Sequence, residues 1–124
     1  MYSCEEILIL GRRVRIAVYE TEDGINVLIE GGDKGHIGAV AIAGGGNVME
    51  SIVFPSHQED VVCRHWAEKI STVYSGSVIV EAGIHYEGIT KKQIQEVLEE
   101  LEKELEKLVR KILKKQWEQE TELK

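Results

Sequence analysis

The sequence predicts an α+β fold, an α/β sandwich with a four-strand antiparallel meander, then a helix, a fifth strand and a long C-terminal helix packed on the sheet. Two observations predict it. Residues 6–54 alternate between runs rich in Ile, Leu and Val and short glycine-containing breaks, which is typical of strands joined by turns. Beyond residue 56, two segments with apolar side chains at helical spacing flank one short β-rich run.

Length and composition limit the class of protein. The chain has 124 residues, 43% of them hydrophobic, and a net charge of −7. These values fit one globular domain, with a core over about residues 6–113 and residues 114–124 as a helical extension or frayed tail. We expect no membrane span, no secretory signal and no nucleic-acid partner. Cys4 and Cys63 cannot form a disulfide framework, so a cytoplasmic location is expected.

The meander is predicted from periodicity and turn residues. Between Glu6 and Tyr19, arginines alternate with aliphatic residues, as in a strand with one buried face. Glycine-rich stretches then separate three further apolar runs. The four strands are expected at residues 6–19, 25–29, 37–43 and 48–54, with Gly44–Gly46 as an ordinary hairpin turn.

The helices are predicted from their starting signals. Ser56 and Glu59 fit a capping box, and Thr90 and Gln93 fit a second one. The first helix should reach residue 73, a fifth strand should cover residues 77–82, and the second helix should run through residue 118. Trp66 and the apolar stripe of the second helix are interpreted as core, and His65 as structural.

Connectivity brings several unusual residues to one edge of the expected sheet. The third and fourth strands form a hairpin, so His36 and His57 lie near each other. A crossover from the fourth strand through the helix to a parallel fifth strand returns His85 to the same edge. Gly31 and Gly32 end the second strand there, and both helix N-termini point to it.

Helix N-termini, glycines and histidines together favour a site for an anion or a phosphate-bearing ligand. Three imidazoles and a water would also suit catalytic zinc, although residues 36, 57 and 85 match no compact metal motif. Each histidine also has an ordinary structural interpretation, as a strand cap, a surface residue or a loop residue. No nucleophile is indicated, since Cys63 falls in the middle of a helix.

Three blocks of sequence carry a resemblance to a known family. They are Gly31–Ala39, with Gly-Gly-x-x-x-His-Ile-Gly-Ala, Pro55–Asp60, with Pro-x-His-x-Glu-Asp, and Ala82–Thr90, with Gly-Ile-His. The chain resembles the prenylated-flavin chaperone-like domain family, which is typified by a small accessory protein of gallate decarboxylase, from about residue 7 to about residue 110. Ser56 and Gln58 depart from the family pattern, which often has a glycine and a basic residue at these positions.

The resemblance implies a non-catalytic, dimeric protein with a fold similar to that of proteasome-assembly chaperones. It would bind prenylated FMN or FMN and assist a decarboxylase, with that decarboxylase or a flavin prenyltransferase as its partner. The phosphate or ring would be held by His36, His57 and His85, with backbone amides near Gly31–Gly32 and Ser56–His57. The expected cofactor-binding residues are Gly31, Gly32, His36, Ile37, Gly38, Ser56, His57, Glu59, Gly83 and His85.

Three alternatives stay open. The chain could be a chaperone-like homodimeric interaction module without a small-molecule ligand. It could be a histidine-based metal-dependent enzyme. It could also be a coiled-coil assembly factor acting through residues 97–117, although spacing closer to 3.6 than to 3.5 residues favours packing on its own sheet.

Overall fold

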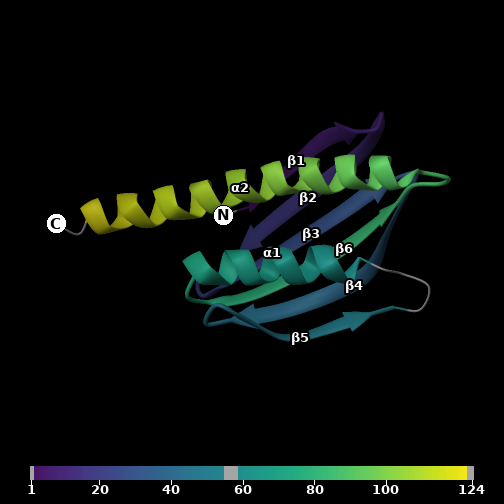
Figure 1. The fold of residues 1–124 in the computed structure, drawn as a ribbon. Coiled ribbons are helices and arrows are strands. Elements are labelled where there is room, and N and C mark those ends of the chain that lie inside the picture. Colours follow the sequence, from purple (N-terminus) through teal and green to yellow (C-terminus); the bar gives the residue numbers. More distant parts are fainter. Residues whose placement is uncertain (1, 55–58, 123–124) are drawn as a thin grey trace.

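The computed structural model describes residues 2–54 and 59–122, in which a six-stranded mixed sheet carries both helices on one face (Figure 1). The strand order is β1-β2-β3-β6-β4-β5. The predicted α+β class is therefore confirmed. The elements are β1 (Tyr2–Ile9), β2 (Arg12–Glu20), β3 (Gly24–Gly32), β4 (Lys34–Gly44), β5 (Asn47–Val53), α1 (Asp60–Val73), β6 (Ser77–His85) and α2 (Lys91–Glu122).

The first predicted strand is a hairpin, which corrects the single strand expected at residues 6–19. β1 and β2 pair antiparallel, and Ile9 opposite Arg12 is the pair next to the turn. The two residues between them, Leu10 and Gly11, have φ values of 52° and 73°. Two-residue hairpin loops of this kind need positive φ at both positions. An apolar leucine at the first position concealed this turn in the sequence.

The predicted meander is also interrupted, because β6 lies between β3 and β4. β6 runs parallel to β3, with Val27 opposite Val80, and antiparallel to β4, with Ala41 opposite Val80. β6 is therefore a central strand, and Val78, Val80 and Ala82 on its helix-facing side are fully buried. β4 lies between β5 and β6 and is antiparallel to both, so β5 and β6 are parallel. The crossover from β5 through α1 to β6 therefore passes over β4.

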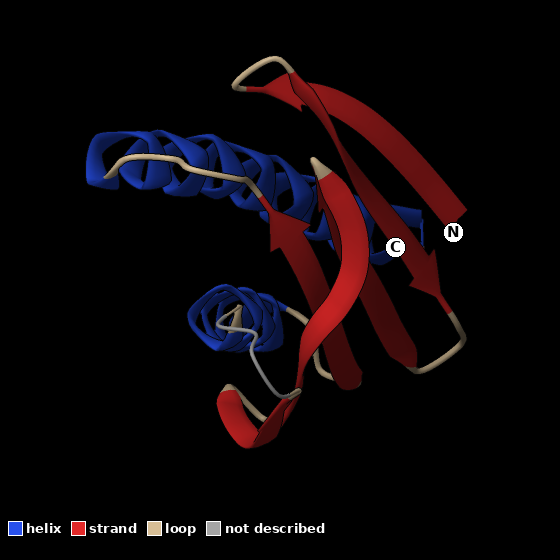
Figure 2. Cartoon of the chain, turned by 90° about the vertical axis from the view of Figure 1, so that its right-hand side faces the viewer, coloured by secondary structure: helices blue, strands red, loops and turns tan. Residues whose placement is uncertain are grey.

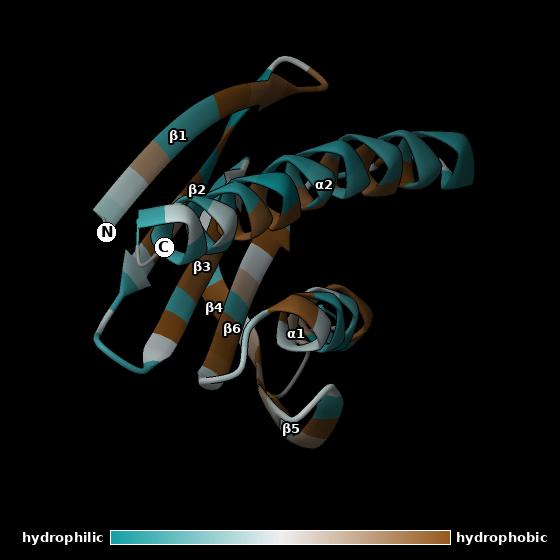
Figure 3. Cartoon of the chain, turned by 90° about the vertical axis from the view of Figure 1, so that its left-hand side faces the viewer, coloured by the Kyte–Doolittle hydropathy of each residue, from teal (hydrophilic) through white to brown (hydrophobic). Residues whose placement is uncertain are grey.

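Both helices cover the same face of the sheet, and no described element covers the other face (Figure 2). Figure 3 shows hydrophobic bands recurring along β3, β6 and both helices. Trp66 of α1 is 1% exposed and belongs to the core, as predicted. Half of the α2 stripe is buried as expected (Val97, Leu101, Leu105, Leu108 and Ile112), whereas Ile94, Leu98, Leu113 and Trp117 are exposed.

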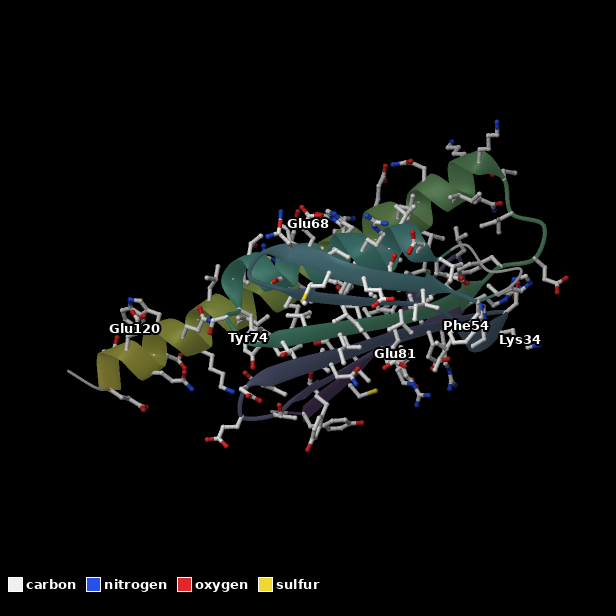
Figure 4. The ribbon with its side chains drawn as sticks, turned by 90° about the horizontal axis from the view of Figure 1, so that it is seen from below. Lys34, Phe54, Glu68, Tyr74, Glu81 and Glu120 are labelled. Atoms are coloured by element: carbon white, nitrogen blue, oxygen red, sulfur yellow. The ribbon has the colours of Figure 1, made fainter. Side chains whose placement is uncertain are left out.

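The outer sides of the two layers carry charged residues. Figure 4 shows Glu68 on the outer side of α1 and Glu81 of β6 on the side of the sheet that faces away from the helices. Along β6, Glu81 alternates with Val80 and Ala82, which are fully buried. This alternation is typical of a strand with one face packed on the core and the other open to water.

The two helix starts differ. The predicted second capping box is confirmed: the amide of Thr90 donates to Gln93 Oε1 at 2.9 Å, and the amide of Gln93 donates to Thr90 Oγ1 at 3.1 Å. α1 begins later than expected, at Asp60, and its N-cap residue Glu59 makes no side-chain capping bond. The helix start predicted at Ser56 is therefore wrong, because Glu59 is itself the N-cap residue. The predicted bond between Glu59 and Ser56 lies outside the described residues.

α2 is the longest element. Its 32 residues span about 48 Å, and its C-terminal part extends beyond the sheet (Figure 1). Of the described helices, none has the length and apolar character that crossing a bilayer requires.

Candidate functional site

One end of the sheet gathers the residues that the sequence singled out. β3 and β6 are parallel and both end there, with Gly32 opposite His85. β4 starts there, with Lys34 opposite His85, and both described helices begin at the same end (Figure 1). The predicted convergence is therefore confirmed for the described residues. Ser56 and His57 lie outside them.

A largely buried histidine–carboxylate pair lies at this edge. Nε2 of His36 is 2.9 Å from Oε1 of Glu59, and the two side chains are 15% and 13% exposed. Because a carboxylate oxygen only accepts, the ring nitrogen is the donor. The rings of His36 and His85 meet edge to face, with centroids 6.3 Å apart. His85 is more open, and its Nε2 lies 3.6 Å from Oε1 of Glu87.

A bulge in β4 places His36. The pairing of β4 with β6 shifts register between Gly35 and Ala39, so the backbone of His36 passes directly over Gly83 of β6. A Cβ atom on Gly83 would overlap the carbonyl oxygen of His36 and lie 2.8 Å from the amide nitrogen of Ile37. Gly83 thus has a packing role: it lets β4 approach closely enough to direct His36 toward Glu59.

The glycines at the end of β3 also have a structural role. Gly32 has a φ of 82°, and an added Cβ would overlap the carbonyl oxygen of His85. The adjacent Gly31 meets the Arg13 carbonyl in the same way. Elsewhere in the expected set, Ile37 is 44% exposed, and the Gly38 carbonyl accepts a bond of 2.8 Å from the Phe54 amide.

Asp33 joins β3 to the segment after β6. Its amide donates to the carbonyl of His85 at 2.7 Å, and its carboxylate accepts from the Glu87 amide at 2.8 Å and from Nε of Arg12 at 2.6 Å. The Glu87 amide, followed by the Arg12 guanidinium, lowers the pKa of the Asp33 carboxyl. The Asp33 amide is therefore occupied within the fold.

The N-terminus of α1 already carries two negative charges. Glu59 Oε2 and Asp60 Oδ1 are buried without a hydrogen-bond partner, and Asp60 Oδ2 lies 4.0 Å from Arg64. Carboxylates offset the positive end of the helix dipole. They also repel a further anion nearby, so the surroundings of Glu59 favour an uncharged or cationic group.

An apolar groove of about 400 Å³ adjoins this edge, between α1, β6 and the first half of α2. Its volume lies in the range of small-molecule sites. Glu59 and His85 line it together with aliphatic residues, so the groove and the histidine edge are continuous. Sequence reasoning missed this groove. Its apolar lining comes chiefly from Val62, Ala82, Ile84, Ile89, Ile94, Val97, Leu98 and Leu101.

A larger hollow of about 760 Å³ lies elsewhere, at the turn between β2 and β3 and the C-terminal half of α2. Glu20, Glu22 and Asp23 line it, and none of the predicted site residues does. Its lining also includes Lys111 and Lys115, so both signs of charge are present, and we assign it no part in the site.

Among the described residues, no three His, Cys, Asp or Glu side chains are grouped to hold a metal ion. Burial raises the pKa of the Cys63 thiol to about 12. His65 bonds to Glu102 at 2.7 Å on the outer surface of the helices, which agrees with its structural interpretation. Gly44 ends β4, Gly45 and Gly46 connect it to β5, and the Gly46 amide donates to Ser71 Oγ.

The fold and this edge define a small α+β protein in which an apolar groove opens beside a histidine- and glycine-rich sheet end. Residues 10–113 match the family model described as the prenylated flavin chaperone LpdD-like domain, and the chain belongs to this family. The predicted resemblance is thereby confirmed. Protein LpdD of Lactiplantibacillus plantarum is 34% identical over 73 residues, covering 55% of this chain and 54% of that protein. The chain therefore matches only about half the length of this curated relative.

Proposed function

We propose that this chain is a non-catalytic accessory protein that binds prenylated FMN or FMN at the histidine edge and assists a flavin-dependent decarboxylase. The observation that carries this proposal is the continuity of that edge with an apolar groove in a member of the prenylated flavin chaperone LpdD-like family. His36, His57 and His85 are the proposed contacts to the cofactor. Amides near Gly31–Gly32 and Ser56–His57 are further proposed donors.

A holding function fits the chemistry of the described residues. An apolar groove excludes water from a reactive cofactor, and an edge exposed to solvent allows release to a partner. The buried Cys63 thiol, with its raised pKa, is a poor nucleophile. The partner in this proposal is the decarboxylase that receives the flavin or the prenyltransferase that supplies it.

Cofactor delivery tests the proposal. An apo-decarboxylase would be mixed anaerobically with reduced prenylated FMN, with and without this chain, and the rate of activation measured. We expect faster or more complete activation with the wild-type chain. His85→Ala should weaken this effect, whereas His65→Ala, which removes another exposed histidine with a glutamate partner, should not. Equal activation with and without the chain would contradict the proposal.

We also propose that the protein self-associates through α2. Trp117 is 66% exposed near the C-terminal end of α2, and tryptophans are enriched among the residues that anchor protein interfaces. The mass in solution, measured by light scattering, should be that of a dimer for the wild type and of a monomer for Trp117→Glu. A monomeric wild type, or an unchanged dimer in the variant, would refute this assignment.

A further inference from the structure

We propose that the groove between α1, β6 and α2 holds the uncharged ring system of the flavin, with Glu59 accepting a hydrogen bond from a ring N–H and the phosphate remaining outside. This inference rests on the proposed flavin-binding function and divides the ligand between two parts of the site. It gives Glu59, so far an expected cofactor-binding residue without a stated contact, a place beside the ring.

The walls of the groove match a planar apolar group. β6 supplies Ala82 and Ile84 to its lining, α1 supplies Val62, and α2 supplies Leu98 and Leu101. Leu98 is 38% exposed, and that exposed surface lines the groove. Removing apolar surface of this kind from water is favourable in proportion to the area covered. A ring system would cover the exposed surface of Leu98 and Ile94, whereas a phosphate would leave it in contact with water.

Glu59 supplies the polar contact. Its Oε1 is bonded to His36, but its Oε2 is buried without a hydrogen-bond partner. A buried acceptor without a partner is unfavourable, because it has lost its contact with water and gained nothing in return. Glu59 lines the groove, so a donor that enters the groove can approach this carboxylate while Oε1 keeps its bond to His36. The imide N–H of a flavin ring is such a donor.

Charge excludes the phosphate from the same place. Glu59 and Asp60 bring two carboxylates to the start of α1, and the described residues that line the groove include no lysine or arginine. Lys91 and Lys92 are exposed at the start of α2, and only Thr90 separates them from the groove residue Ile89. The phosphate is therefore expected at the mouth of the groove, on the side of these lysines.

Paired titrations with riboflavin and FMN separate the two parts of the ligand, because only FMN carries a phosphate. Leu98→Gln, which makes the groove wall polar, should weaken binding of both flavins about tenfold. Leu113→Gln is the matched control, since Leu113 is 47% exposed on the same helix but does not line the groove. It should leave both affinities unchanged. Ile94→Gln, at a second exposed groove position, provides a repeat if Leu98→Gln unfolds by circular dichroism.

Glu59→Gln distinguishes contact of Glu59 with the ring from contact with the phosphate, because the two predict opposite changes in FMN affinity. Contact with the ring predicts that riboflavin and FMN are weakened by the same factor. Contact with the phosphate predicts the opposite, a selective gain in FMN affinity when the negative charge is removed. Wild-type protein that binds neither flavin, nor reduced prenylated FMN, would refute the proposed function itself. Wild-type binding that is unaffected by the groove variants would overturn only this inference.

Discussion

Gly83→Ala tests whether the close approach of β4 to β6 at Gly83 positions His36 beside Glu59. The added methyl group would overlap the His36 carbonyl oxygen and lie 2.8 Å from the amide nitrogen of Ile37. Both neighbours are backbone atoms, so no flexible side chain can move aside. β4 must instead move away from β6, in the segment that directs His36 toward Glu59.

The expected cost follows from this overlap. Overpacking a tightly packed site costs about 1–3 kcal/mol and occasionally more, and a backbone clash belongs at the upper end of that range. In a chain of this size, about 3 kcal/mol lowers the thermal midpoint by roughly 10 °C or more. Thermal unfolding followed by circular dichroism measures this shift directly. Flavin affinity should fall at temperatures where the variant is still folded, because the His36–Glu59 pair is displaced.

Gly44→Ala is the matched control on the same strand as His36. Its added Cβ would meet nothing closer than Met49 Sδ at 3.5 Å, an ordinary contact. The stability of this variant should therefore stay within about 0.5 kcal/mol of the wild type. A Gly83→Ala midpoint equal to that of Gly44→Ala would refute the proposed packing role of Gly83.

Two further predictions concern individual side chains. Cys63 is buried and its pKa is raised, whereas Cys4 is exposed. Ellman's reagent should therefore titrate one thiol in the native protein and both thiols after denaturation. Two rapidly reacting thiols in the native protein would contradict the buried position of Cys63. The pKa of Asp33 is lowered by the Glu87 amide and by Arg12, so its carboxylate stabilises the fold above the ordinary aspartate pKa of 3.8, and this contribution is lost as the pH falls through the lowered value. Asp33→Asn should therefore lower the thermal midpoint at pH 7, with the difference from wild type shrinking below about pH 4, and a pH-independent difference would oppose this reasoning.

Local patterns predicted the elements better than their pairing. Alternation and turn residues indicated most strands, and the Thr90–Gln93 box located the start of α2. The Leu10–Gly11 turn was missed because leucine rarely signals a turn, and aliphatic residues typical of strands recur on both sides of it. The position of β6 between β3 and β4 depends on pairing between distant segments, which no local pattern specifies.

The place of the site could be predicted from strand connectivity, but its side-chain contacts and its groove could not. The meeting of Gly32, His36 and His85 required only that the strands share one sheet. The partner of Glu59 depends on the β4 bulge, which forms because Gly83 leaves room for it. The groove depends on the separation of the two helices across the sheet. Its one sequence signal was that apolar residues at the start of α2 form a stripe wider than a single buried face requires.

Flavin binding itself is best tested by an anaerobic calorimetric titration of the full chain with reduced prenylated FMN. We predict saturable binding of one cofactor per chain, tighter than that of FMN, because the additional apolar ring would enter the groove. A control flavoprotein would establish that the cofactor preparation is competent. Absence of binding by this chain, under conditions in which the control binds, would contradict a cofactor-holding function.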